Sequence, residues 1–85
     1  MTIESSVRTY VLENYLFTED QSELENNDSF LEKGIIDSTG VLEIILFLEE
    51  EFGITVSAEE MVPKNLDSVT SIVNFIKKKK LKETA

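Results

Sequence analysis

The chain has 85 residues, of which 17 are acidic and eight basic, and it contains neither histidine nor cysteine. These absences exclude a Ser-His-Asp or Cys-His nucleophile, a zinc site built on His and Cys and disulfides. The net charge of −9 makes nucleic acid a poor partner. An apolar fraction of 41% is enough for one small core. We therefore expect a single domain over residues 1–85, with an ordered core over about 3–79, and no catalytic apparatus of its own.

A first helix is predicted over 3–16, because apolar residues recur there at helical spacing. Residues 17–37 show no clear period. A connection this long is unusual in a small domain. We expect it to be pinned, with Phe30 and Leu31 reaching the core.

The second helix is predicted over 38–52, with Gly53 as its stop signal. A helical wheel divides its side chains between two faces. The buried stripe is Val41, Ile44, Ile45, Leu48 and Phe52. The outward face is Thr39, Glu43, Leu46, Phe47 and Glu50, with Glu49 and Glu51 on the flanks.

Two large apolar residues, Leu46 and Phe47, thus face away from the predicted core within a ring of carboxylates. One explanation is that the long loop folds over them, or that they are ordinary single exposures. The other is an interface for a partner with a basic patch. We favour the interface.

The remaining chain predicts two more helices and a basic tail. Ser57 followed by Glu60 fits a capping box for a short helix at about 58–62, ended by Pro63. A last helix over 66–79 would begin from Asn65 as its cap. The fold class is therefore all-α: a bundle of three longer helices and one short one, with a long first loop.

The last nine residues, 77–85, hold five lysines and one glutamate. We interpret this basic tail, including Lys82, as a solvated helix end, where lysines also suit the helix dipole. A role in nucleic-acid or membrane binding is the minority alternative. No apolar run approaches about 18 residues and no secretory signal is visible, so a cytoplasmic protein without membrane insertion is expected.

The second helix starts at Asp37-Ser38, and both residues are good N-caps. Without histidine, Ser38 has no base to make it a nucleophile. A helix N-terminus does favour phosphate, so a phosphodiester on Ser38 would be well placed. Asp37 beside it would position a modifying enzyme or that enzyme's metal ion.

Two stretches, Gly34-Ile35-Ile36-Asp37-Ser38-Thr39-Gly40-Val41-Leu42-Glu43-Ile44 and Leu48-Glu49-Glu50-Glu51-Phe52-Gly53-Ile54, resemble the acyl carrier and peptidyl carrier protein family. The resemblance implies an acyl-carrier-like four-helix bundle. It also implies that a phosphopantetheinyl transferase moves 4′-phosphopantetheine from coenzyme A onto Ser38, with Asp37 as part of the recognised motif. The arm's thiol would then hold an acyl or aminoacyl thioester, which explains how a chain without cysteine can do thiol chemistry.

The resemblance further implies that the acidic second helix is the docking face, which by position means Glu43, Leu46, Glu49 and Glu50. The wheel adds Thr39 and Phe47. The expected partners are the transferase, an acyl- or aminoacyl-loading ligase or transferase, and downstream acyl-transferring enzymes with basic docking patches. The carrier itself is expected to be a monomer that binds no metal.

The cargo depends on details of the motif. Many fatty-acid carriers have Leu or Met after the serine, where this chain has Thr39. With Gly34 before the serine and Gly40 after it, the motif is closer to stand-alone D-alanyl or aminoacyl carriers, or to carriers of secondary-metabolite pathways. We predict a discrete acyl carrier, as in fatty-acid or polyketide biosynthesis. The first alternative is a D-alanyl or aminoacyl carrier, and the second is an unmodified acidic interaction module in which Ser38 is only a cap.

Overall fold

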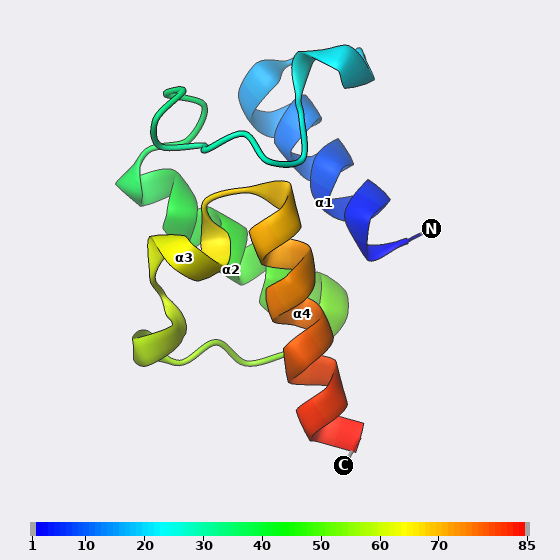
Figure 1. Cartoon of the computed structure of the whole chain (residues 1–85), viewed down its shortest axis with the longest axis vertical. Helices are drawn as coiled ribbons and strands as arrows, with labels where there is room; N and C mark the ends of the chain where they lie inside the picture. The colour runs from blue at the N-terminus through cyan, green and yellow to red at the C-terminus, as the bar shows by residue number, and fades with distance from the viewer. Residues whose placement is uncertain (1, 85) are drawn as a thin grey trace.

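The computed structural model describes residues 2–84, and the side chains of residues 2–80. Within this range every regular element is helical, which confirms the predicted all-α fold. The elements in chain order are α1 (Ile3–Val11), a π-helical turn η1 (Leu12–Leu16), a 3-10 turn η2 (Gln21–Glu23), α2 (Ser38–Phe52), a 3-10 turn η3 (Ala58–Glu60), α3 (Pro63–Leu66) and α4 (Val69–Thr84). In Figure 1, α4 crosses in front of α2, while α1 and α3 lie on opposite sides of α4.

The core lies between the three long helices. Each of them contributes side chains that are at most 1% exposed, such as Val11 from α1, Leu48 from α2 and Ile76 from α4. The predicted helical stripes therefore do face one another. Burial of these apolar surfaces is the main term that stabilises the fold.

The predicted first helix over 3–16 is continuous but changes its winding. Thr2 caps α1, because its Oγ1 accepts a hydrogen bond from the Ser5 N–H at 3.0 Å. The π-helical turn η1 follows directly, and Phe17 ends it with φ 53°. Phe17 donates its N–H to the Leu12 carbonyl.

The long loop is pinned to α1 mainly by Arg8, and the Glu4 carboxylate also accepts a hydrogen bond from the Asn26 side-chain amide. The Arg8 guanidinium donates to the side chain and carbonyl of Gln21, to the Leu24 carbonyl at 2.7 Å and to the Asn26 side chain. Arginine suits this role because its planar group offers five donors in a fixed fork.

The end of the same loop is pinned to the α3–α4 junction. Phe30 donates its N–H to the Asp67 carbonyl at 2.8 Å, and Leu31 donates to the Asp67 carboxylate at 3.0 Å. Phe30 is 1% exposed, so its predicted place in the core is confirmed. The same prediction for Leu31 is wrong, because that side chain is 41% exposed. Residues 30–34 form a turn, in which Phe30 is buried and Leu31 is exposed.

In the second half of the chain, two helix boundaries differ from the prediction. The Ser57–Glu60 capping box is present, but Pro63 begins α3 instead of ending the preceding turn. The final helix does not start from Asn65, since α4 begins at Val69. Its real cap is Ser68, whose Oγ accepts the Ser71 N–H at 3.1 Å.

The helix breaks there because the loop binds Asp67. Asp67 ends α3 with ψ −1°, and its carbonyl and carboxylate accept the N–H groups of Phe30 and Leu31. The apolar period runs through this break, so the sequence pattern alone indicates one helix. Of the predicted basic tail, Lys77 and Lys78 are exposed, and the Lys82 side chain lies outside the described residues.

Candidate functional site

The site begins at the first turn of α2, where Asp37 and not Ser38 is the N-cap. The Asp37 Oδ1 accepts the Gly40 N–H at 2.8 Å. Ser38 is consequently the first helical residue, and its side chain is exposed. Among the described residues, the Ser38 hydroxyl makes no hydrogen bond, and neither do the N–H groups of Ser38 and Thr39. A phosphate esterified to Ser38 would therefore meet two free donors at the positive end of the helix.

The start of α2 is packed tightly against Ile36 and Tyr15. A Cβ added at Gly40 would lie 2.6 Å from the Ile36 side chain and 3.3 Å from the Tyr15 ring. Ile36 is 2% exposed, so it has no room to move away. Only glycine fits here without displacing the segment that carries Ser38.

Tyr15 is a member of this site that the sequence did not indicate. Its hydroxyl lies 3.4 Å from the Gly40 carbonyl oxygen. Burial above all raises the pKa of Tyr15, and Tyr10 together with the carboxylates of Glu43 and Asp37 acts in the same direction. The ring stays neutral and supports the first turn of α2.

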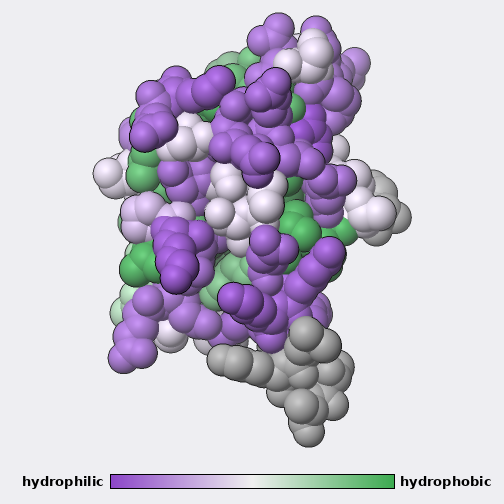
Figure 2. All heavy atoms as spheres, in the orientation of Figure 1, coloured by the Kyte–Doolittle hydropathy of each residue, from purple (hydrophilic) through white to green (hydrophobic). Residues whose placement is uncertain are grey.

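A groove of about 280 Å³ opens beside Ser38. It is formed by the end of the long loop, by α2 and by the segment from η3 through α3. Its apolar lining residues are Phe30, Leu31, Val41, Leu42, Ile45, Met61, Val62, Pro63 and Leu66, and Ser38 and Asp67 complete it. Figure 2 shows hydrophobic atoms at the edge beside α3, on a face that is otherwise largely hydrophilic.

Several groove residues are large, apolar and exposed. Leu42 is 57% exposed, and Met61 and Val62 are each 39% exposed. None of the three was predicted from the sequence as a site residue. A signal for Leu42 did exist, because it lies about 100° from Val41 on the helical wheel and so outside the buried stripe.

The predicted outward face of α2 is largely exposed. Thr39, Glu43 and Glu50 are exposed, and Leu46 is 59% exposed. Together with Leu42, Leu46 continues the apolar surface of the groove along the helix, and the two carboxylates border it. We call these five residues the α2 face.

Phe47 does not face away from the core, so that prediction is wrong. Its ring stacks on Tyr10 of α1 with a centroid distance of 4.0 Å, and it meets Phe52 edge-on at 6.1 Å. On the wheel Phe47 lies about 240° from Val41. Because α1 packs against that flank, the buried arc is wider than the apolar stripe indicates.

Glu49 is half-buried and has a structural bond. Its Oε2 accepts the Val56 N–H at 3.0 Å, which ties the end of α2 to the segment before η3. This bond accounts for one of its carboxylate oxygens. Glu49 therefore stands apart from the α2 face.

The acidic side chains described over residues 2–80 form no group of three that could hold a metal ion. None of the helices described over residues 2–84 has both the length and the hydropathy needed to cross a bilayer.

The chain was compared with known families and proteins. A family model described as "Phosphopantetheine attachment site" matches residues 16–76, a span that includes Ser38. The chain is also 38% identical over 76 residues to proteins named D-alanyl carrier protein from Streptococcus pyogenes serotypes M1 and M49 (strain NZ131). The alignment covers 89% of this chain and 92% of each of those proteins.

Proposed function

Because the chain belongs to the phosphopantetheine attachment-site family, we propose that it is a discrete D-alanyl carrier that bears 4′-phosphopantetheine on Ser38. Members of this family carry a group and do not catalyse its chemistry, so the protein is a carrier and not an enzyme. The observation that carries the proposal for Ser38 is its exposed hydroxyl at the start of α2, next to two unused N–H donors.

The residues at this position suit the prosthetic group. When bound, the group supplies the thiol that the chain lacks, and an acyl or aminoacyl cargo is held on it as a thioester. Ser38 offers the oxygen for the phosphodiester. Asp37 holds the helix start through Gly40, so the attachment point is fixed on a rigid element.

The aminoacyl alternative is a better account of the cargo than a fatty-acid or polyketide chain. The relatives named D-alanyl carrier proteins align over 92% of their own length. Thr39 after the serine, with Gly34 and Gly40 around it, fits the same reading of the motif. The family match disfavours an unmodified interaction module, because the matching family is defined by phosphopantetheine attachment.

Carrier function implies at least two kinds of partner, a phosphopantetheinyl transferase and a loading enzyme. We propose that the loading enzyme is a ligase that activates D-alanine and transfers it to the arm's thiol. Downstream acyl-transferring enzymes would dock through basic patches on the α2 face, because Glu43 and Glu50 border an exposed apolar centre there.

The cargo is tested by loading the modified carrier. The protein is first converted with coenzyme A, magnesium and a broad-specificity transferase, and then incubated with ATP and a D-alanine-activating ligase. Intact mass spectrometry is expected to show one added D-alanyl group on the modified carrier and none on the unmodified protein. Parallel reactions offer L-alanine, or a fatty acid with an acyl ligase. Efficient loading of the fatty acid but not of D-alanine would overturn the cargo assignment.

The α2 face is tested by reversing its charges. Glu43→Lys or Glu50→Lys is expected to raise the apparent KM of the loading enzyme about three- to tenfold, with helicity unchanged, because steering by exposed charges is lost. Circular dichroism and steady-state loading rates measure the two effects. Glu51→Lys is the matched control, since Glu51 is exposed on α2 outside this face. An equal rise in KM for Glu51→Lys would show that net charge alone matters.

The apolar centre of the face gives a second readout. Leu46→Ala should change the free energy of unfolding by less than about 1 kcal/mol, because the side chain is already 59% exposed. A loss of about 3 kcal/mol, as for a buried leucine, would contradict the exposure of this residue.

A further inference from the structure

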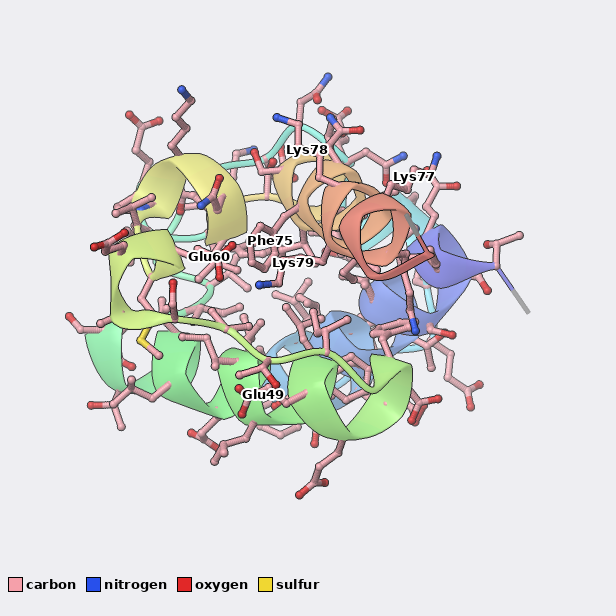
Figure 3. All side chains as sticks on the ribbon, turned by 90° about the horizontal axis from the view of Figure 1, so that it is seen from below. Glu49, Glu60, Phe75, Lys77, Lys78 and Lys79 are labelled. Carbon is pink, nitrogen blue, oxygen red and sulfur yellow. The ribbon has the colours of Figure 1, made fainter. Side chains whose placement is uncertain are left out.

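Lys79 is largely buried, unlike its exposed neighbours Lys77 and Lys78. Lys79 points from α4 into the space toward Glu60, whereas Lys77 and Lys78 lie on the outer side of α4 (Figure 3). The Lys79 Nζ lies 2.8 Å from the Glu60 Oε1, and the two side chains are only 20% and 26% exposed. The Lys79 Nζ also lies 5.9 Å from the centre of the Phe75 ring, which is itself buried.

Glu60, the last residue of η3, accepts several of the hydrogen bonds that hold the segment from η3 to α3. The oxygen that binds Lys79 also accepts the N–H and the hydroxyl of Ser57. The Glu60 carbonyl accepts the Val62 N–H at 2.9 Å and the Asn65 side-chain amide at 3.0 Å. Fixing Glu60 therefore fixes the backbone on both sides of it.

The segment that Glu60 holds is one wall of the groove beside Ser38. Met61 and Val62 follow Glu60 directly, and both line the groove. Pro63, the next residue, begins α3 and lines it as well. A shift of Glu60 would move this wall relative to α2, because the opposite wall belongs to a different element. The ion pair thus links α4 to the position of this groove wall.

We propose that Lys79 is a positioning residue, which holds Glu60 and thereby fixes the groove wall that the phosphopantetheinyl transferase contacts beside Ser38. This inference rests on the proposed carrier function but not on the identity of the cargo. Hydrogen bonds from Lys79 above all, and from Ser57, lower the pKa of Glu60 to about 2. Glu60 accordingly stays charged throughout the neutral range in which such enzymes are assayed.

The experiment uses the unmodified full chain and a broad-specificity phosphopantetheinyl transferase with coenzyme A. Three variants are compared: Lys79→Gln, Glu60→Gln and the double variant. Glutamine at position 60 keeps an oxygen for the capping box, so it removes the ion pair without removing the turn. Lys78→Gln is the matched control, because it makes the same charge change at the exposed neighbour.

We expect Lys79→Gln and Glu60→Gln each to raise the apparent KM for the carrier about fivefold, with kcat unchanged because Ser38 and α2 are untouched. The double variant should match the single variants, since both remove the same pair. Lys78→Gln should behave as the parent protein. In amide NMR spectra, the residues 57–66 should shift in the three variants and stay in place in the control.

The outcomes separate two failures. If the parent protein is not modified at all, the carrier assignment itself fails. If it is modified, and Lys79→Gln has the same KM as the parent while remaining folded by circular dichroism, the positioning role is overturned. Additive effects in the double variant, or equal shifts in the Lys78→Gln spectrum, would also overturn it. Should Lys79→Gln fail to fold, Glu60→Gln decides the same question through KM and kcat.

Discussion

The Ser38→Ala protein is expected to gain no mass when it is incubated with coenzyme A, magnesium and a phosphopantetheinyl transferase, whereas the parent protein gains one phosphopantetheine group. The substitution removes the exposed hydroxyl of the first residue of α2, which makes no hydrogen bond inside the described structure. Loss of the arm removes the thiol, so loading should fall to zero. Intact mass spectrometry measures both steps.

The same variant is expected to fold normally. Asp37, not Ser38, caps α2, and its bond to the Gly40 N–H at 2.8 Å is untouched by the change. The free energy of unfolding should therefore stay within about 0.5 kcal/mol of the parent value. Asp37→Ala, in contrast, should cost about 1 kcal/mol, the usual effect of losing an N-cap.

Ser22→Ala is the control for the mass experiment, because Ser22 is an exposed serine in the long loop, away from α2. It should be modified as the parent is. A mass gain that persists in Ser38→Ala would move the attachment site elsewhere. A loss of helicity in Ser38→Ala would show that the serine has a structural role that the hydrogen bonds do not indicate.

The second helix could be predicted to the residue because its signals are local. Asp37 caps its start through Gly40, three residues on, and Gly53 ends it with φ 65° and an N–H bonded to the Glu49 carbonyl. Each signal acts within one turn of the helix, so a sequence pattern contains it fully. The position of Ser38 at the start of this helix follows from the same signals.

The boundary between α3 and α4 depends on a distant segment and could not be predicted in the same way. Asp67 ends α3 while it accepts hydrogen bonds from Phe30 and Leu31, which lie more than thirty residues earlier. The groove has the same origin, since its walls come from three separate segments. For Phe47, the missing information was that Tyr10 of α1 covers its flank. In each case the sequence specifies the residue, but only packing decides its neighbours.

The strongest effect on stability is expected at Phe30, because its large buried ring anchors the end of the long loop in the core. It is 1% exposed, and its backbone donates to the Asp67 carbonyl at 2.8 Å and accepts the Ile35 N–H at 2.9 Å. Phe30→Ala should lower the free energy of unfolding by about 3–5 kcal/mol. A domain of this size has roughly 4–13 kcal/mol in all, so a large share would be lost.

Urea unfolding followed by circular dichroism measures this loss, with Leu31→Ala as the matched control. Leu31 is the next residue of the same loop but is 41% exposed, so its truncation should cost less than about 1 kcal/mol. The slope of the free energy of unfolding with urea concentration should not change if both variants still unfold in one step.

An equal loss of stability for the two variants would mean that the loop is held by its backbone bonds to Asp67 and not by the buried ring. A small loss for Phe30→Ala, with the ring's space refilled by its neighbours, would contradict a rigidly packed core around Phe30. The measured difference between these adjacent residues therefore tests whether the loop that forms one wall of the groove is part of the core.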